Sequence, residues 1–225
     1  MSSTGIGVPV RRKEDYRYIT GGGRYTDDIN RPGQAHAYFL RSPHAHATIE
    51  SIDAAAARGM PGVLAILTGD DLATDKIGGL ICGWMIHNKD GSPMKAGAHP
   101  ALAQGKVRYV GDHVAVIIAD TLAQARDAAE AVVVDYGVLT PVVDTASAVG
   151  AKAVVHDVAP DNTVFNWHLG NKDETEAAFK AAKHVISMDI VNNRLAPNPM
   201  EPRAAIGDYD KAEEHVFDAA DDCLG

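Results

Sequence analysis

The stretch of residues 107–136 limits the possible folds more than any other part of the chain. Residues 114–119 form an unbroken apolar run rich in β-branched side chains, which is typical of a strand buried on both faces. Thr121 and Gln124 then match a capping box, in which the hydroxyl accepts from the third helical amide and the Gln side chain reaches back to the cap. The stretch therefore predicts a buried strand followed directly by a helix.

The helix predicted after Thr121 has an apolar and a polar face. Gln124, Asp127 and Glu130 lie on the polar face. The residues expected on the core face are Leu122, Ala125, Ala129, Val132 and Val133. Because residues 132–136 read as a second strand with almost no loop before it, we predict a compact βαβ-like unit. This unit is a core without obvious chemistry.

Shorter elements are predicted on the N-terminal side of this unit. The predicted strands cover residues 34–41, 45–52 and 63–67, and the predicted helices cover residues 54–58, capped by Asp53, and 68–72. Residues 1–17 and 73–105 are predicted to be irregular, because they are rich in Gly and Pro. Within the second stretch, Trp84, Met85 and Ile86 are expected to anchor the loop on the core.

Residues 145–153, which follow the core unit, are small and predict a linker with a short helix and a domain boundary. Asn171 is expected to cap a helix that has Glu174 at its third position. Its expected packing face consists of Ala178, Phe179 and Ala182. The strand-like segments on this side of the boundary are residues 154–156, 163–169, 183–192 and 204–209.

Composition excludes several classes of protein. The net charge of −9 over 225 residues argues against nucleic-acid binding, because phosphates would be repelled. No apolar run approaches the roughly 20 residues that cross a bilayer, and residues 1–18 lack the apolar core of a secretory signal. Cys82 and Cys223 are too few for a disulfide framework. We therefore expect a cytoplasmic protein with reduced thiols that binds neither nucleic acid nor membrane.

Two motifs could suggest a ligand, and both favour a structural interpretation. The run of residues 21–23 is all glycine, but it lacks the preceding strand and the Gly-Lys-Ser/Thr ending of a phosphate loop, so we expect a tight turn with positive φ. His44 and His46 would share one face of a strand. Zinc would need a third ligand that nothing in the sequence ties to this pair. We therefore expect no metal ligands in the chain.

One polar arrangement stands out near the end of the chain. Glu201 and Arg203 flank Pro202 in the sequence NPMEPR, and the prolines restrict the backbone there. A preorganised glutamate could orient a small substrate or act in proton transfer. A structural salt bridge or an exposed turn charge explains the same residues, and the two interpretations remain open on the sequence alone.

Several segments, taken in order, resemble a known family. The segments are residues 18–29 (YITGGGRYTDDI), 32–33 (PG), 40–46 (LRSPHAH), 60–63 (MPGV), 67–72 (LTGDDL) and 107–117 (VRYVGDHVAVI). Together they resemble the amino-terminal portion of the molybdenum-binding large subunit of the xanthine dehydrogenase, aldehyde oxidase and carbon monoxide dehydrogenase family. The resemblance extends over roughly residues 11–214, and residues 198–209 (NPMEPRAAIGDY) resemble the family's stretch near the substrate cavity. Glu201 matches a glutamate that faces the substrate in some members.

The resemblance implies an α/β (α+β) protein built as an α/β hammerhead domain, with a mixed sheet and short helices, followed by an incomplete second α/β domain. The implied division has an irregular N-terminal segment over residues 1–17, the hammerhead domain over 18–143, the start of the molybdopterin-binding domain over 144–214 and an atypical tail over 215–225. The tail reads HVFDAADDCLG where the family pattern would continue with a strand, as after a truncation or a shifted reading frame.

The family's chemistry is the oxidation of a small substrate with an oxygen atom from water. The full-length complex holds molybdenum on molybdopterin (as the cytosine dinucleotide), with FAD on a medium subunit and 2Fe-2S clusters on a small subunit. The family's cofactor-gripping loops and catalytic base lie beyond residue 225 in this resemblance. We therefore expect no catalytic, cofactor-binding or metal-binding residue in this chain, apart from Glu201 as a candidate substrate-cavity residue.

Three interpretations follow from the resemblance. The chain is an enzyme part that folds but binds no molybdenum alone, a free-standing non-catalytic hammerhead module used for assembly, or a gene remnant. An incomplete second domain would leave apolar surface uncovered, which favours a partner or a homo-oligomer. The substrate is not predicted, because the residues that distinguish carbon monoxide from aldehydes or purines are not in this chain.

Overall fold

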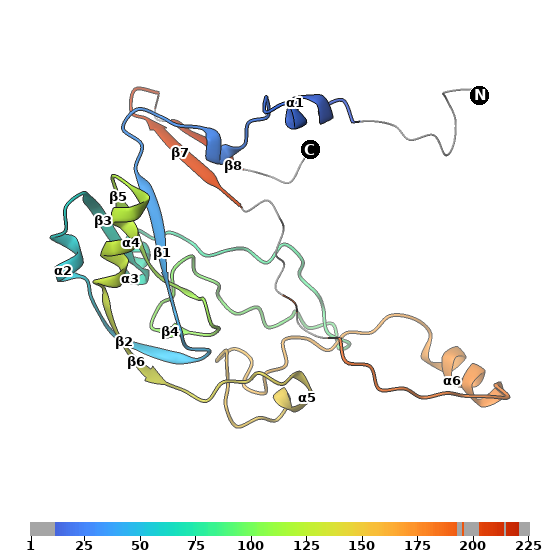
Figure 1. Cartoon of the computed structure of the whole chain (residues 1–225). Helices are drawn as coiled ribbons and strands as arrows, with labels where there is room; N and C mark the ends of the chain where they lie inside the picture. The colour runs from blue at the N-terminus through green and yellow to red at the C-terminus, as the bar shows by residue number, and fades with distance from the viewer. Residues whose placement is uncertain (1–11, 193–194, 196–202, 214, 221–225) are drawn as a thin grey trace, which may run out of the picture. The chain divides into compact units, whose positions relative to one another are not determined.

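A computed structural model of the chain describes residues 12–192, 195, 203–213 and 215–220 (Figure 1). The chain divides into two compact units. Unit 2 is continuous and consists of Ala35–Ile186, whereas unit 1 combines Met1–Gln34 with Ser187–Gly225. Both hydrophobic clusters of buried residues lie in unit 2.

The first sheet of unit 2 has three antiparallel strands in the order β1-β5-β3. Strand β5 (His113–Ala119) pairs on one side with β1 (His36–Arg41) and on the other with β3 (Val63–Thr68). Val116 is the register partner of both Phe39 and Leu67. The apolar run of residues 114–119 thus forms the central strand, as its composition predicts, with Val114, Ala115, Ile117 and Ala119 buried.

The second sheet has the order β4-β2-β6, and it is also antiparallel. Strand β2 (Ala47–Asp53) lies between β4 (Lys106–Val107) and β6 (Val133–Val138). The predicted βαβ-like unit is therefore wrong, because β5 and β6 belong to different sheets. The α/β hammerhead class with short helices is confirmed. The sequence predicts one mixed sheet, whereas the described strands form two small antiparallel sheets and a separate hairpin.

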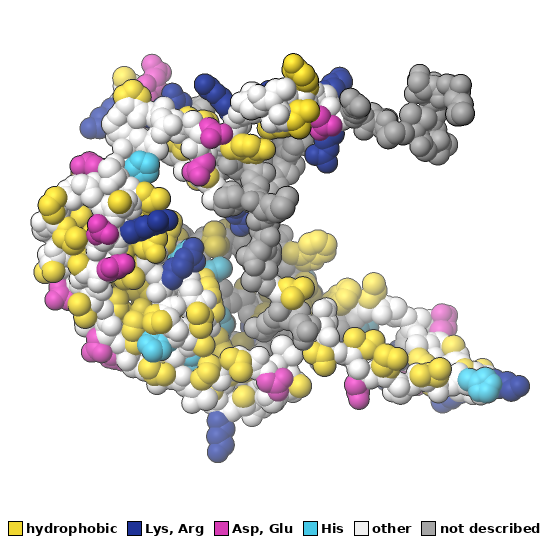
Figure 2. Space-filling model, in the orientation of Figure 1, with side chains coloured by type: hydrophobic (Ala, Val, Ile, Leu, Met, Phe, Trp, Pro, Cys, Tyr) yellow, Lys and Arg dark blue, Asp and Glu magenta, His cyan; other side chains and the backbone are white. Residues whose placement is uncertain are grey.

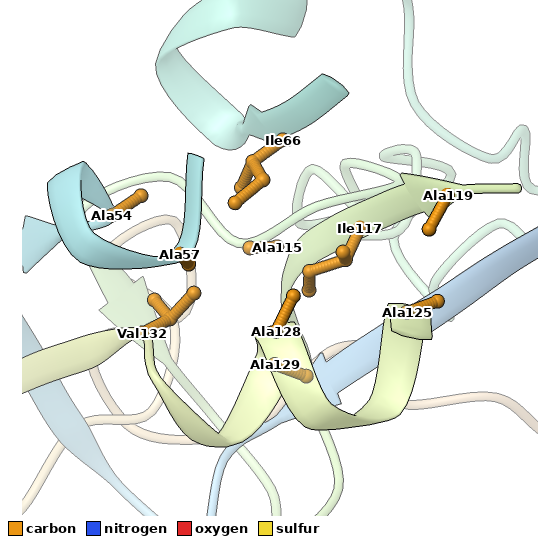
Figure 3. Packing of buried hydrophobic residues seen from close by; sticks show 10 residues of the cluster. All are labelled: Ala54, Ala57, Ile66, Ala115, Ile117, Ala119, Ala125, Ala128, Ala129 and Val132. Atoms are coloured by element: carbon orange, nitrogen blue, oxygen red, sulfur yellow. The ribbon is translucent and has the colours of Figure 1, made fainter. Parts of the chain in front are cut away.

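Helix α4 (Leu122–Glu130) covers the first sheet with a face made of alanine (Figure 3). Ala125, Ala128 and Ala129 are buried against residues that include Ile66 and Ile117. Small side chains let the helix approach the strands closely, so the core is tight rather than large. The predicted face is corrected at its ends, because Leu122 and Val133 are exposed.

The start of α4 matches the predicted cap in part. The Thr121 hydroxyl accepts a hydrogen bond from the Gln124 amide at 3.2 Å, as predicted. The Gln124 side chain also reaches back, but its oxygen accepts from the Thr121 hydroxyl at 2.8 Å. The pair satisfies one of the free amides of the first turn and fixes the helix start.

Four other helices are described in unit 2. They are α2 (Ala55–Arg58), α3 (Gly69–Thr74), α5 (Thr145–Ala148) and α6 (Lys172–Ala181). The predicted Asn171 cap is confirmed, because its side chain accepts from the Glu174 amide. The predicted Asp53 cap is corrected: the Asp53 carboxylate accepts from the Ala55 amide, but α2 begins one residue later than predicted and Ala54 is its N-cap. The expected packing face of α6 is wrong, since α6 has no buried residue and Phe179 is exposed.

Residues 75–105 are irregular, as their glycine and proline content predicts, apart from one isolated bridge between His87 and Pro93. Two of the expected anchors are wrong, because Trp84 is 81% exposed and Met85 is half exposed, whereas Ile86 is half-buried and its amide donates to the Met94 sulfur. Leu102 and Ala103 are buried in their place. The sequence favours the larger aromatic and sulfur-containing side chains, whereas the chain buries Leu102 and Ala103 a few residues before β4.

Three segments predicted as strands are irregular in the described residues. They are residues 154–156, 163–169 and 183–192. Alternation and β-branched content favour extended backbone, but a strand also needs a hydrogen-bonded neighbour. No pairing of these segments occurs among the described strands.

Unit 1 contains α1 (Asp15–Ile19), the 3₁₀ turn η1 (Thr26–Asp28) and a hairpin of β7 (Ala205–Asp210) with β8 (His215–Ala220). Residues 1–17 were expected to be irregular, but α1 begins within them at Asp15. Gly21 has a positive φ, as predicted, with a value of 74°. Strand β8 lies in the tail, where the sequence suggests that the strand pattern is lost. Within the residues the structure describes, no helix has the length and apolar content needed to cross a membrane.

Candidate functional site

The glutamate singled out by the sequence, Glu201, lies outside the described residues, as do its neighbours from Ala196 to Pro202. Arg203 is described and is exposed just before β7. The choice between a substrate-facing glutamate and a turn charge therefore stays a prediction.

The two histidines examined for metal binding separate in the structure, because the chain bends before β2 begins. His46 is only 4% exposed, and its Nδ1 lies 3.0 Å from the Thr140 carbonyl oxygen. A carbonyl can only accept, so Nδ1 carries the proton and Nε2 is left as a buried acceptor without a partner. His44 instead lies edge-on to the Tyr136 ring at 5.0 Å between centroids. The shared strand face predicted for the pair is wrong.

His46 belongs to a cluster of positive and titratable groups in unit 2. Burial lowers the pKa of His156, and Arg108 lowers it further; Asp157 acts in the opposite direction, and His46 and His99 add to the lowering. Across the described part of the chain, no three His, Cys, Asp or Glu side chains are arranged to hold a metal ion. Burial and the Arg108 guanidinium therefore favour the neutral form of His156.

His156 is packed closely on the backbone of the long irregular stretch. A Cβ at Gly97 would overlap the His156 imidazole, so this contact requires glycine at position 97. The Arg108 Nε donates to the Val155 carbonyl at 3.2 Å, directly beside the ring. Residues 155 and 156 therefore contact the chain at two places, Gly97 and Arg108.

Asn162 organises this segment from within. Its Oδ1 accepts from the Val155 amide at 3.1 Å, and its Nδ2 donates to the carbonyls of Ala148 at 3.0 Å and Ala153 at 2.9 Å. Its φ of 56° lies in the left-handed region, which Asn tolerates better than most residues. Asn162 was not identified from the sequence, although Pro160-Asp161-Asn162 is a recognisable turn signal.

Ion pairs and backbone bonds extend the contact in both directions. Lys106 Nζ lies 3.7 Å from Asp157 Oδ1, and Lys95 Nζ lies 3.3 Å from Asp161 Oδ1. The Lys95 amide also donates to the Val164 carbonyl at 2.9 Å. Because Asp157 and Asp161 are well exposed, each ion pair contributes little alone.

The contact ends at two asparagines. The Asn166 amide donates to Asn88 Oδ1 at 2.6 Å, and the Lys89 amide donates to the Asn166 carbonyl at 2.9 Å. We call the whole contact, between residues 88–108 and residues 148–166, the junction. Its bonds are mainly backbone and amide hydrogen bonds, so it fixes geometry rather than performing chemistry.

A polar turn at the start of β5 contacts the junction through Arg108. Asp112 is nearly buried; its Oδ2 accepts from the Arg108 amide at 3.0 Å, and its carbonyl accepts from the Ser42 amide at 2.8 Å. The Gly111 amide donates to the Ser42 carbonyl at 2.8 Å, with a φ of 91° that favours glycine. Arg41 Nη1 completes the turn by donating to the Gly111 carbonyl at 3.1 Å. The turn ties the end of β1 to the start of β5.

The described residues do not fit a pterin cofactor by themselves. A cofactor site is a concave pocket that buries most of its ligand. None of the described residues after Ala159 is buried, and the one unpartnered buried side-chain atom of the described set, His46 Nε2, lies far earlier in the chain. No catalytic step through the cofactor can therefore be assigned to these residues.

Comparison with known proteins identifies both halves of the junction. The model of the aldehyde oxidase and xanthine dehydrogenase a/b hammerhead domain matches residues 20–140, and the model of the molybdopterin cofactor-binding domain matches residues 155–218. The junction thus joins residues inside the first matched region, 88–108, to the beginning of the second and to the residues just before it.

Individual relatives agree with this assignment. The large subunit of nicotine 6-hydroxylase from Paenarthrobacter nicotinovorans is 36% identical over 94% of this chain, and the carbon monoxide dehydrogenase large chain from Hydrogenophaga pseudoflava is 37% identical over 88%. Quinoline 2-oxidoreductase from Pseudomonas putida 86 has a similar structure, with a TM-score of 0.81, 33% identity and 93% of this chain covered.

The chain spans about a quarter of the length of these relatives, since it covers 25% of each of the two large subunits and 26% of the solved chain. The relatives are named as subunits or chains of larger enzymes. The match over residues 20–140 covers more than half of the sequence. The chain therefore belongs to the family of molybdenum hydroxylase large subunits that includes aldehyde oxidase and xanthine dehydrogenase.

Proposed function

We propose that the chain is the amino-terminal quarter of a large subunit of a molybdopterin-dependent hydroxylase, and that it supplies scaffold rather than catalysis. The junction is the observation that supports this best. It joins the hammerhead match to the start of the cofactor-binding match through defined hydrogen bonds, so the two regions are built to work as one subunit. We place the hammerhead domain at residues 18–143, the start of the cofactor-binding domain at 144–214 and a tail at 215–225.

The proposed reaction is oxidation of a small substrate with oxygen from water. Molybdenum on molybdopterin cytosine dinucleotide supplies this chemistry when it is bound in the complete subunit. The substrate remains open, because relatives of almost equal identity are named for nicotine and for carbon monoxide, which have little chemistry in common. Substrate choice therefore depends on residues outside the shared scaffold.

Glu201 is our candidate for the point where this chain meets the substrate. It is placed there by its position in the sequence NPMEPR, which resembles the stretch near the family's substrate cavity. A carboxylate between two prolines has few backbone conformations available, which suits a positioning role. In a complete, active complex, Glu201→Gln should lower kcat/KM, whereas Glu213→Gln, a change at a nearby exposed glutamate, should not.

The proposed partners are a medium subunit that binds FAD and a small subunit that holds 2Fe-2S clusters. Several relatives are named as one subunit of a complex, which supports a multi-subunit assembly. We propose a cytoplasmic location, since Cys82 is a free and exposed thiol.

Metal analysis tests the proposal directly. The purified chain should contain no molybdenum after expression in a host that makes the cofactor, because none of its described residues after Ala159 is buried. The same chain, joined with the part of a large subunit that it does not match, should bring molybdenum into the complex. Stoichiometric molybdenum in the isolated chain would overturn the scaffold role.

A free-standing hammerhead module is the alternative, and the position of the cores favours it. Both buried clusters lie within Ala35–Ile186, so this unit has the interior of an independent domain. If the module interpretation is right, no complex with the remainder of a large subunit should acquire molybdenum. The two functions therefore give opposite results in the same metal measurement.

A further inference from the structure

The segment Ser187–Asn192 has the backbone and composition of a strand but no strand beside it. All of its residues are exposed and outside helix or strand. Among the described residues, none of its amides or carbonyls has a hydrogen-bond partner. Six residues is an ordinary strand length, so the segment is long enough to join a sheet.

The side chains of this segment are those of a buried strand rather than a loop. Met188 and Ile190 are two apart and would share a face, and they are 74% and 80% exposed. Val191 is also exposed. Exposed apolar side chains in a run are unusual on a finished protein surface and mark a place where something binds.

The β7–β8 sheet, which belongs to unit 1 like this segment, has only two strands among the described residues. It consists of β7 and β8 alone, and a two-stranded hairpin is at best marginally stable in water. Tyr209 on β7 is more than half exposed. Tyr209 on β7 and the apolar side chains of Ser187–Asn192 therefore lack neighbours that would bury them among the described residues.

We propose that Ser187–Asn192 is an edge strand that pairs with a strand from the unmatched remainder, meaning the part of a molybdenum hydroxylase large subunit that this chain does not match. This inference rests on the proposed function. The length comparison identifies the occupant, because the chain covers 25% of its relatives and the cofactor-binding match runs through this segment to residue 218.

The charge of the chain and the residues before the segment in the sequence also fit a protein strand as the occupant. The chain's net charge of −9 disfavours a nucleic acid as the occupant. Figure 2 shows hydrophobic side chains gathered along the part of unit 2 that carries α6, and Leu169 and Ile186 there are more than 85% exposed. Uncovered apolar side chains thus precede the segment as well, as expected if the unmatched remainder covers this region.

The test uses the full chain and the unmatched remainder of the nicotine 6-hydroxylase large subunit. The relative's own matched quarter is the positive control, since its binding shows that the remainder is folded and competent. We expect a one-to-one complex by size-exclusion chromatography with light scattering. Hydrogen exchange at residues 187–192 should slow by about tenfold or more in the complex, because the amides acquire partners.

Two double variants distinguish binding through this segment from non-specific binding through exposed apolar side chains elsewhere. Met188→Lys with Ile190→Lys should weaken binding about a hundredfold, from the lost burial of two apolar side chains. Leu64→Lys with Val133→Lys, at two exposed positions on the hammerhead sheets, should bind as the parent chain does.

Three results would overturn the inference. One is the absence of a complex while the relative's own quarter binds. A second is a complex in which residues 187–192 exchange as fast as in the free chain. The third is slow exchange of these residues in a dimer of the chain alone, which would make a second copy the occupant. Molybdenum content is read separately: protection at residues 187–192 without molybdenum would support the strand pairing and contradict the proposed function.

Discussion

Single residues explain why the junction has a defined geometry. Asn162 closes its own loop with three hydrogen bonds, and His156 fits against Gly97 with no room for a side chain at that position. Arg108 connects this loop to the chain before β5 through its contact with the Val155 carbonyl. These side chains act on backbone groups, so their loss should be seen in stability and not in chemistry.

Asn162→Ala should lower the free energy of unfolding by about 2 kcal/mol, because three hydrogen bonds are lost at a half-buried site. Asn162→Gly is the matched variant. It loses the same bonds but accepts the left-handed backbone, so it should cost about 1 kcal/mol less. Urea denaturation followed by circular dichroism measures both. Equal stability of the parent and both variants would show that the Asn162 bonds do not hold the loop.

Two histidines should make stability depend on pH. The pKa of His113 is lowered by burial and then by Arg41, and that of His156 is lowered by burial and then by Arg108. Because the unfolded chain then binds more protons near the unfolded pKa of about 6.5, stability is complete above that pH and falls as the pH is lowered through it.

The carboxylates add a separate decline at lower pH. The pKa of Asp71 is lowered by hydrogen bonds from Thr68, and that of Asp161 by the Thr163 amide and then by Lys95, so their contribution is lost below about pH 4. Urea midpoints between pH 7 and 5 isolate the histidine effect. His113→Gln with His156→Gln should flatten the curve in that range, and an unchanged slope would contradict the assignment.

At the scale of elements, the individual strands and helix starts that the sequence predicts correctly are those with local signals. The caps at Thr121 and Asn171 and the apolar run before Asp120 depend on neighbours a few residues away. The pairing of strands was not predicted, because β5 and β6 look like neighbours in sequence but take partners from different sheets. Local pattern contains no information about which distant strand lies alongside.

The candidate site shows the same division. The position of Glu201 follows from resemblance alone, since the structure does not describe it. The junction was not predicted, because it is built from amides, carbonyls and single polar side chains with no periodic pattern. Residues 183–192 were predicted as a strand from alternation, and the missing neighbour explains why they are not one among the described residues.

The alanine face of α4 predicts a sharp size limit. Ala128 is fully buried against the first sheet, whereas Ala123 on the same helix is exposed. Ala128→Leu should therefore destabilise the protein by about 1–3 kcal/mol through overpacking. Ala123→Leu, the matched change, should stay within about 0.5 kcal/mol of the parent. Thermal and urea unfolding measure both, and similar effects at the two positions would contradict the close packing.

At the scale of the whole molecule, stability is concentrated in one of the two units. Both cores and both three-stranded sheets lie within Ala35–Ile186. The described part of the other unit has a hairpin, one short helix and one 3₁₀ turn, with Thr26 as its buried residue. Unit 2 therefore has the hydrophobic interior of a domain that folds by itself. The described part of unit 1 has no such interior, so we expect its stability to depend on further contacts.

A shortened chain of residues 35–186 should therefore unfold cooperatively at nearly the urea midpoint of the full chain. Residues 187–225 alone should show no cooperative transition, because their two described strands cannot form a core. Circular dichroism against urea concentration measures both. Loss of the transition in residues 35–186 would mean that the terminal segments support the hammerhead sheets.

The central place of β5 also decides when the first sheet can form during synthesis. Strands β1 and β3 emerge from the ribosome earlier, yet neither pairs with the other, and both wait for β5. Until residue 119 has been translated and has left the exit tunnel, two β-rich segments stay without their partner, and such segments are exposed to aggregation. The nascent chain should thus bind chaperones most strongly just before Ala119 emerges, and release them once β5 joins the two strands.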